Sequence, residues 1–220
     1  MKKNSFSGDT VPSLFLQKHS AMIRTWHWLT FIILSSSIIT VLLTSTLFNQ
    51  RDNIVVVQNQ LKAKGITVTE DQAFSVSREY EDKLWGVHKL LGYGLAFLLL
   101  SRVMIEFMHK PEEKFRTRMK NSFLLYKQNS ENKKEYRHYL IVKWSYLFFF
   151  VLLFLMVLTG LGLAFGRELS FSRGLHNTVK EIHSITQYFI YAFLLFHVGG
   201  VIIADNTSDK GLVSGMISGN

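Results

Sequence analysis

The chain has 220 residues, of which 48% are hydrophobic and 14% aromatic, and its formal net charge is +9. It contains no cysteine, which excludes disulfides, thiolate catalysis, iron–sulfur ligation and covalent c-type haem attachment. The apolar residues are concentrated in four long blocks, whereas a soluble domain would distribute them at helix or strand period. The composition therefore indicates an integral membrane protein.

Each apolar block is long enough to cross the roughly 30 Å hydrocarbon core of a bilayer as an α-helix. Helices are expected because a spanning segment must satisfy its backbone hydrogen bonds internally. The second block is the most polar, since it contains Lys89, Arg102 and Glu106. We predict an all-α, integral membrane four-helix bundle that forms a single domain over residues 1–220, with spans at about 23–48, 84–107, 144–166 and 182–204.

Lysine and arginine are divided unequally between the two sides of this predicted bundle. The chain ends and residues 108–143 together contain 15 of them, against 8 in residues 49–83 and 166–181. By the positive-inside rule, both termini and the 108–143 loop are expected in the cytoplasm, and the 49–83 loop is expected outside. The membrane thus accounts for the positive charge, and we expect no nucleic-acid partner.

The two longer connections contain local helix signals. The sequence TEDQ at 69–72 fits a capping box, which predicts a helix that runs from there into the second span. This connection is either a solvated hairpin or a docking surface for an external partner. In the other loop, Phe115, Phe123 and Tyr126 alternate with basic residues, which favours a short interfacial helix lying on anionic lipid.

Four of the eight histidines fall inside the predicted spans: His27, His88, His183 and His197. An ionisable residue within a span is a functional hypothesis by default, although any one of them alone could be a packed, hydrogen-bonded side chain. The others lie in loops or at interfaces, where an exposed imidazole is expected: His19, His109, His138 and His176. The relative positions of the first four distinguish these alternatives.

His183 and His197 are 14 residues apart, about 3.9 helical turns, so they face the same way about 21 Å apart along the axis. With the first helix running outward, His27 lies at the level of His197, and His88 lies at the level of His183. Two imidazole pairs at different depths fit bis-histidine haem iron better than a zinc or di-metal site, whose ligands converge in one place. We therefore predict two metal-binding pairs, His27 with His197 and His88 with His183.

Further residues near these histidines fit haem binding. Gly92 lies one turn beyond His88, where a missing side chain would let a porphyrin approach, although small residues also serve ordinary helix packing in membranes. Arg24 lies one turn before His27, and Arg102 reaches the cytoplasmic level, so both could pair with haem propionates or instead extend to lipid headgroups. An interfacial aromatic belt is expected from the four tryptophans, Trp26, Trp28, Trp85 and Trp144.

The chain resembles the four-helix bacterial cytochrome b family, which includes the b-type cytochrome subunit of nickel–iron hydrogenases and related di-haem, quinone-linked cytochromes. The resemblance is carried by RTWHW at the start of the first span, WGVHKLLGYGLAFLLLSR in the second, HSITQYFIYAFLLFH in the fourth and the tail DNTSDKGLVSGMISG. It implies two b haems ligated by His27, His88, His183 and His197, electron exchange with membrane quinone, and a place in the bacterial inner membrane.

Three functions are compatible with these features. The first is a membrane subunit that passes electrons between quinone and an external oxidoreductase, such as a hydrogenase. The second is a self-sufficient quinone-linked oxidase acting on a small external molecule such as superoxide. The third, from another class, is a histidine-bearing metal or proton transporter, which few carboxylates in the spans and no evident repeat argue against.

Overall fold

The structure is a computed structural model that describes residues 20–108, 114–128, 133–207 and 211–219. Within these ranges the chain forms only helices: α2 (Ala21–Ser45), α3 (Gln50–Lys62), α4 (Glu70–Met108), α5 (Phe115–Gln128), α6 (Lys133–Ala164), α7 (Arg173–Asn206) and α8 (Leu212–Ser218). Four of them, α2, α4, α6 and α7, are long and apolar enough to cross a membrane. The prediction of an all-α protein with four spanning helices is confirmed.

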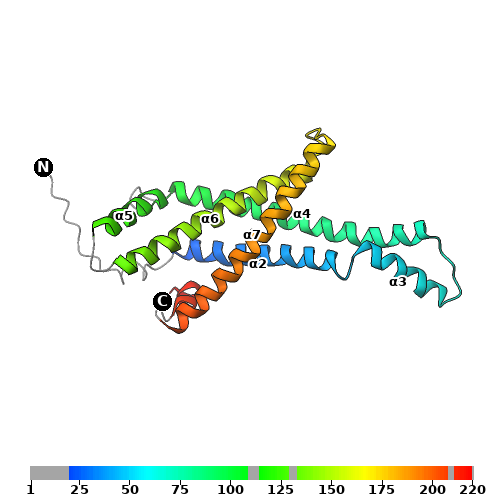
Figure 1. Ribbon diagram of the computed structural model, residues 1–220, viewed down its shortest axis with the longest axis horizontal. Coiled ribbons are helices and arrows are strands. Elements are labelled where there is room, and N and C mark those ends of the chain that lie inside the picture. Colours follow the sequence, from blue (N-terminus) through cyan, green and yellow to red (C-terminus); the bar gives the residue numbers. More distant parts are fainter. Residues whose placement is uncertain (1–19, 109–113, 129–132, 208–210, 220) are drawn as a thin grey trace.

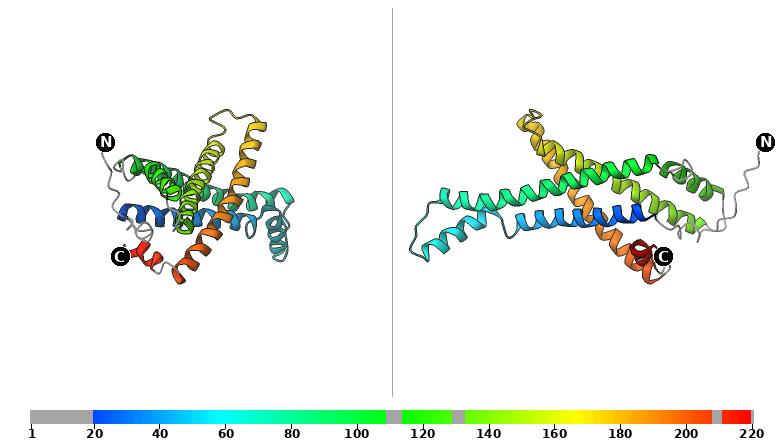
Figure 2. Two further views of the ribbon diagram at one scale, coloured as in Figure 1. Left: turned by 60° about the vertical axis from the view of Figure 1, so that its left-hand side comes forward. Right: turned by 180° about the vertical axis from the view of Figure 1, so that it is seen from behind.

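The long helices form two antiparallel pairs that cross each other (Figures 1 and 2). Helices α2 and α4 lie side by side, and α6 and α7 form the second pair. The start of α2, α5 and α8 gather at one end of the bundle, which we call the terminal end (Figure 1). The opposite end, which we call the loop end, carries α3 and the turn between α6 and α7.

One apolar core joins the two pairs at the middle of the bundle. Its buried side chains come from all four long helices: Leu34, Leu95, Leu99, Leu152, Leu153 and Ile190. Large apolar side chains on the outer faces remain exposed along the same helices, as a lipid-facing surface requires. Since lipid tails are as apolar as leucine, close packing rather than the hydrophobic effect holds such helices together.

Helix α4 is much longer than a membrane crossing needs. Its 39 residues extend about 58 Å, so residues 70–83, which precede the predicted span, would project beyond the hydrocarbon core at the loop end. The predicted capping box is present: the Thr69 amide donates to Gln72 Oε1 at 2.9 Å, and the Gln72 amide donates to Thr69 Oγ1 at 3.3 Å. Helix α3 packs against α4, so residues 49–83 form a helical hairpin.

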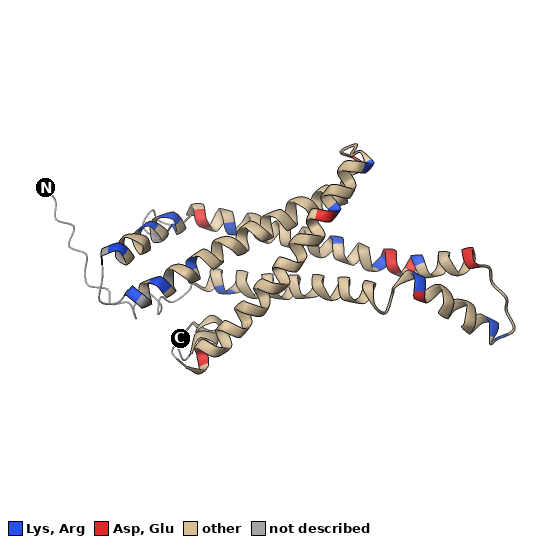
Figure 3. Cartoon of the chain, in the orientation of Figure 1, with Lys and Arg blue, Asp and Glu red and all other residues tan. Residues whose placement is uncertain are grey.

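The other helices also depart from the predicted spans at their ends. Helix α6 begins at Lys133, well before residue 144, and α7 begins at Arg173, because polar and basic turns extend both helices past the apolar blocks. The predicted interfacial helix is present as α5, which contains Phe115, Phe123 and Tyr126. Lys and Arg residues concentrate on α5 and the first turns of α6, whereas the middle of the bundle contains few charged residues (Figure 3).

Two of the tryptophans make hydrogen bonds to other helices of the protein. Trp26 is only 9% exposed, and its indole N–H donates to the carbonyl of Leu98 on α4 at 2.7 Å. The Trp28 indole donates to the carbonyl of Met216 on α8 at 3.1 Å. Both side chains therefore join elements of the protein, since an indole buried between helices satisfies its single donor there. Trp85 and Trp144 are exposed, and their place in a belt stays a prediction.

The core makes a testable prediction about packing. Leu153 is fully buried, so Leu153→Ala should leave a cavity and cost about 2–5 kcal/mol of stability. Thermal unfolding in detergent, followed by far-ultraviolet circular dichroism, would measure the loss. Leu158→Ala is the matched control because Leu158 lies on the same helix with 56% of its surface exposed. Equal losses in the two variants would contradict the proposed core.

Candidate functional site

Four imidazoles meet in two pairs, one near each end of the bundle. At the terminal end the ring centres of His27 on α2 and His197 on α7 are 6.2 Å apart. At the loop end the ring centres of His88 on α4 and His183 on α7 are 6.5 Å apart. The level-matched pairs expected from the helix directions are thus the pairs that lie together in the structure.

These separations suit two imidazoles that share one metal ion on opposite sides. A bond of about 2 Å from each nitrogen to the metal, with roughly 1 Å more to each ring centre, places the centres about 6 Å apart. Within the described residues, no group of three or more histidine, cysteine, aspartate or glutamate side chains could hold a metal ion. Each pair could therefore supply two nitrogens to one metal ion, and the other ligands of that ion would have to come from a cofactor such as haem.

Hydroxyl groups from neighbouring helices contact both imidazoles of the loop-end pair. Thr40 Oγ1 on α2 lies 3.0 Å from His88 Nδ1, and Ser37 Oγ lies 3.3 Å from the same nitrogen. Thr159 Oγ1 on α6 lies 2.9 Å from His183 Nδ1. The three hydroxyl residues are buried, so water does not compete for these contacts.

The threonines determine which nitrogen of each imidazole carries the proton. Thr40 donates its only hydroxyl proton to the Ser37 carbonyl at 2.6 Å, and Thr159 donates to the Leu155 carbonyl at 2.6 Å. A threonine hydroxyl that donates to its carbonyl accepts from the histidine, so these contacts favour the tautomer of His88 and of His183 with the proton on Nδ1. Nε2 is left with a free lone pair, as a metal ligand requires.

A glycine on α6 leaves room for His183. A Cβ atom at Gly160 would lie 3.3 Å from His183 Cε1, closer than most Cβ contacts allow. Because Gly160 directly follows Thr159, the same turn of α6 both accommodates the imidazole and bonds to it. Gly92 differs, since a Cβ there would meet no atom within 4 Å. Packing against the described protein atoms therefore does not explain the glycine at position 92.

Aromatic rings surround the terminal-end pair. The ring of Phe193 is nearly parallel to that of His197, 8° between planes at 5.7 Å, and Phe193 in turn stacks on Phe149 of α6 at 4.8 Å. Trp28 meets His27 edge to face at 5.7 Å. The orientation of His197 thus depends on stacking, whereas hydroxyl contacts orient the loop-end imidazoles.

The two predicted arginines both lie near the terminal end but have protein neighbours. Arg102 forms an ion pair with Glu106 at 3.3 Å and lies over the ring of Phe150 at 5.7 Å. The guanidinium of Arg24 rests against Gly219, which has a positive φ of 82° at the end of α8, so any side chain at position 219 would collide with it. Arg24 thus lies beside the C-terminal carbonyls of α8, which attract a cation.

The remaining histidines are not part of either pair. His138 and His176 are exposed, as expected for imidazoles outside the spans. His19 and His109 lie outside the described residues. Sequence reasoning missed Ser37, Thr40 and Thr159, although hydroxyl residues at 37, 40 and 44 repeat at helical spacing inside an apolar span.

A membrane bundle that presents facing imidazoles at two levels, with nitrogens prepared as ligands, belongs to the class of helical b-type cytochromes. The family model described as prokaryotic cytochrome b561 matches residues 18–219, and the chain belongs to this family. No curated protein and no solved structure shows significant similarity to the chain. The protein is therefore a multi-pass membrane cytochrome that binds haem b through histidines and functions in electron transfer, which fits a bacterial inner membrane.

The hydroxyl contacts generate a prediction about haem binding. Thr159→Val keeps the side-chain shape but leaves His183 Nδ1 without its acceptor, so we expect haem at this pair to be retained about tenfold less tightly. The midpoint potential of this haem should rise, because an imidazole that no longer donates from Nδ1 is a weaker electron donor to iron. Haem content and a redox titration of the purified protein measure both effects.

Thr186→Val is the matched control for this experiment. Thr186 is also buried, and its hydroxyl donates only to the Ile182 carbonyl of its own helix, at 2.7 Å. This variant should retain both haem content and potentials. The same changes in both variants would show that any buried threonine matters and that the contact with His183 has no particular role.

Proposed function

We propose that the protein holds two b haems, one between His27 and His197 and the other between His88 and His183, and conducts electrons between the two ends of the bundle. The observation that carries the proposal is the facing of the imidazoles across 6.2 and 6.5 Å. When bound, each haem supplies a one-electron couple. The chain contributes the axial nitrogens, their orientation and an apolar surrounding that excludes water.

Two helices independently support a two-level arrangement. On α7, which is continuous through both ligands, the 14 residues from His183 to His197 correspond to about 21 Å. On α2, the 13 residues from His27 to Thr40, which contacts His88, correspond to about 20 Å. The pairs are thus too far apart to share one cofactor, and together they extend over much of the hydrocarbon thickness.

The distribution of charge supports a cytoplasmic position for both termini. Basic residues concentrate on α5 and the start of α6 at the terminal end, whereas the hairpin at the loop end carries both signs (Figure 3). The positive-inside rule places the more basic side in the cytoplasm. The His27–His197 pair would then lie near the cytoplasmic face, and the His88–His183 pair near the external face.

An external redox subunit would find its docking surface on the projecting hairpin of α3 and α4. Apolar side chains on this hairpin are exposed although it extends past the expected membrane surface, among them Val55 and Tyr80, each 55% exposed. Such side chains outside lipid are characteristic of contacts with another protein. We therefore favour an electron-transfer subunit of a larger oxidoreductase over an enzyme that acts alone.

Membrane quinone would bind beside the terminal-end pair. A groove of about 290 Å³ between α2 and α8 is lined mainly by apolar side chains, including Trp28, Ile32 and Ile217, with Arg24 also in its wall. An arginine N–H beside an apolar groove can donate to a quinone carbonyl. Arg24 could instead form an ion pair with a propionate of the haem at this end. Arg102 could do the same if its ion pair with Glu106 were broken.

Ligand replacement tests the haem assignment. His27→Ala and His197→Ala should each lower the haem content from two per chain to one and remove the same component of a redox titration. His88→Ala and His183→Ala should remove the other component, because each haem depends on both of its imidazoles. Haem-to-protein ratio by pyridine haemochrome, together with the redox titration, measures both effects.

The control for these variants is His138→Ala, since His138 is exposed and lies outside the apolar part of α6. It should retain two haems. If His27→Ala and His197→Ala removed different components, the pairing would be wrong although haem binding stood. A wild-type protein without a reducible b-type absorption band would overturn the whole assignment.

The orientation has its own test. A green fluorescent protein fused to the C-terminus should fluoresce, and an alkaline phosphatase fused there should be inactive, because the first folds in the cytoplasm and the second outside it. Insertion of the same reporters after Gly65, in the turn of the hairpin, should give the reverse pattern. The same result at both sites would contradict the proposed topology.

A further inference from the structure

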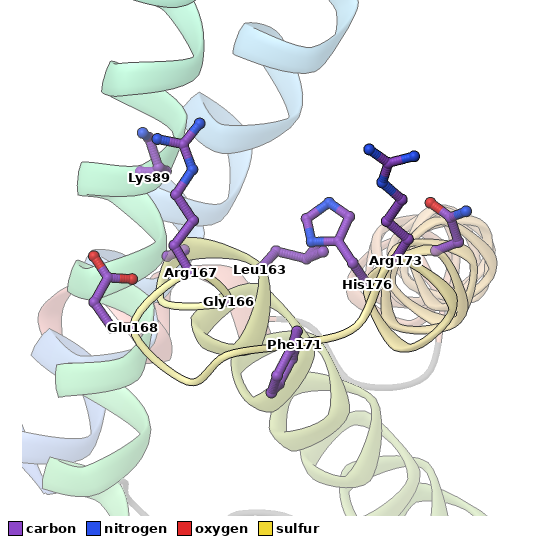
Figure 4. A pocket seen from close by; sticks show the side chains of 10 residues that line it. Lys89, Leu163, Gly166, Arg167, Glu168, Phe171, Arg173 and His176 are labelled. Atoms are coloured by element: carbon purple, nitrogen blue, oxygen red, sulfur yellow. The ribbon is translucent and has the colours of Figure 1, made fainter.

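A cavity of about 720 Å³ lies at the loop end, between α4 and the first turns of α7 (Figure 4). Its volume falls in the range of about 300–1,000 Å³ that is usual for ligand sites. Leu163 at the end of α6 and Phe171 in the α6–α7 turn contribute apolar surface to it. None of the residues predicted from the sequence to bind a cofactor lines this cavity, so its role is a separate question.

The polar lining of the cavity is predominantly basic. Lys89 and Arg167 lie on one side and Arg173 and His176 on the other, with Glu168 as the single carboxylate (Figure 4). Within the described part of the chain, neither Lys89, Arg167 nor Arg173 takes part in an ion pair. Three unpaired cations around one space favour an anion, most of all a planar carboxylate that an arginine can bind with two N–H groups.

The turn that carries the arginines is held by its own backbone. The Phe171 amide donates to the Gly166 carbonyl at 2.9 Å, and the Ser170 amide donates to the Arg167 carbonyl at 3.0 Å. Ser172 then caps α7, since its Oγ accepts from the Leu175 amide at 3.2 Å. The two arginines thus emerge from an ordered frame, which lowers the entropic cost of gathering them around a ligand.

Two of the helices that line the cavity, α4 and α7, also carry the loop-end histidine pair. Lys89 directly follows His88 on α4. On α7, His176 precedes His183 by seven residues, which is two helical turns or about 10 Å, so both lie on the same face. A flat cofactor held between His88 and His183 would therefore have the basic cavity beyond its edge, on the side away from the bundle centre.

We propose that this cavity holds the propionate carboxylates of the haem bound at the His88–His183 pair. The proposal rests on the two-haem function given above and assigns Lys89, Arg167 and Arg173 as their counter-ions. A b haem carries both propionates on one edge, and two carboxylates at a membrane boundary need cations within a few ångströms. These cations also favour the reduced haem, because reduction adds negative charge beside them.

The experiment compares two double variants that each remove two positive charges from the loop end. Arg167→Gln/Arg173→Gln neutralises cations of the cavity, and Lys83→Gln/Lys180→Gln neutralises exposed lysines outside its lining. Holo-protein in nanodiscs of phosphatidylcholine alone is titrated potentiometrically. Infrared redox difference spectra are recorded with haem carrying ¹³C in its propionate carboxylates.

In the cavity variant we expect the reduction equilibrium of one haem to fall about tenfold, equivalent to 59 mV for a one-electron couple. This haem should be the component that is absent from His183→Ala, and its labelled carboxylate bands should shift. The lysine variant should leave both the potentials and the bands as in the wild type. Arg167→Lys/Arg173→Lys, which keeps the charge, should retain most of the wild-type potential.

Three results would overturn the proposal. The first is a cavity variant that matches the lysine variant, and the second is a fall in potential with unchanged labelled bands. The third is a wild-type potential that moves on adding succinate or phosphatidylglycerol while the cavity variant does not respond, which would identify a solute or a lipid headgroup as the occupant. If the protein still contains two haems in each of these cases, only this inference fails and the proposed function stands. A wild-type protein that contains no haem would contradict the proposed function itself.

Discussion

The structure depends on one constraint, which is that imidazoles on different helices must face each other at two depths. Helix α7 contributes one histidine to each pair, so its length between His183 and His197 sets the distance between the two pairs. It must therefore stay helical between these residues. Helices α2 and α4 each contribute a single histidine, at opposite ends of the bundle. The mid-bundle core, formed by leucines of α2, α4 and α6 with Ile190 of α7, holds the four helices between these two levels.

Polar groups inside the bundle are few, and their hydrogen bonds have direct consequences for the site. A threonine in a membrane helix ordinarily returns its proton to a carbonyl of its own helix, as Thr44 does. Thr40 and Thr159 do the same and then use the remaining lone pairs for His88 and His183. An ordinary feature of membrane helices thus favours one tautomer of these two imidazoles.

The two ends of the bundle differ in chemistry. At the loop end, hydroxyl groups orient the imidazoles and a basic cavity lies beyond them. At the terminal end, aromatic stacking orients His197, and α8 closes the bundle through the carbonyl that accepts from Trp28. Hydrogen bonding and nearby cations are among the influences through which a protein adjusts haem potential. If each pair holds a haem, the unlike ends would favour unlike potentials and a preferred direction of electron transfer.

Much of this protein could be predicted from the sequence, because the bilayer imposes simple rules. Hydrophobic length determined the four helices, the 14-residue spacing of His183 and His197 indicated two levels, and TEDQ marked the start of α4. Helix α3 was missed, since its run of valines between polar residues shows no clear helical period. The burial of Trp26 was missed because an indole at a span boundary equally suits lipid and protein.

The sequence by itself determined which residues could be ligands and at what depth, since those properties depend on distance along single helices. Only the tertiary structure decided what surrounds them, because neighbours come from other helices whose rotation and tilt leave no periodic signal. Thr159 lies 24 residues from His183, and Arg167 is 78 residues from Lys89, yet each reaches the same site. The candidate ligands can therefore be identified from spacing along single helices, whereas their hydrogen bonds and nearby cations depend on how the helices pack together.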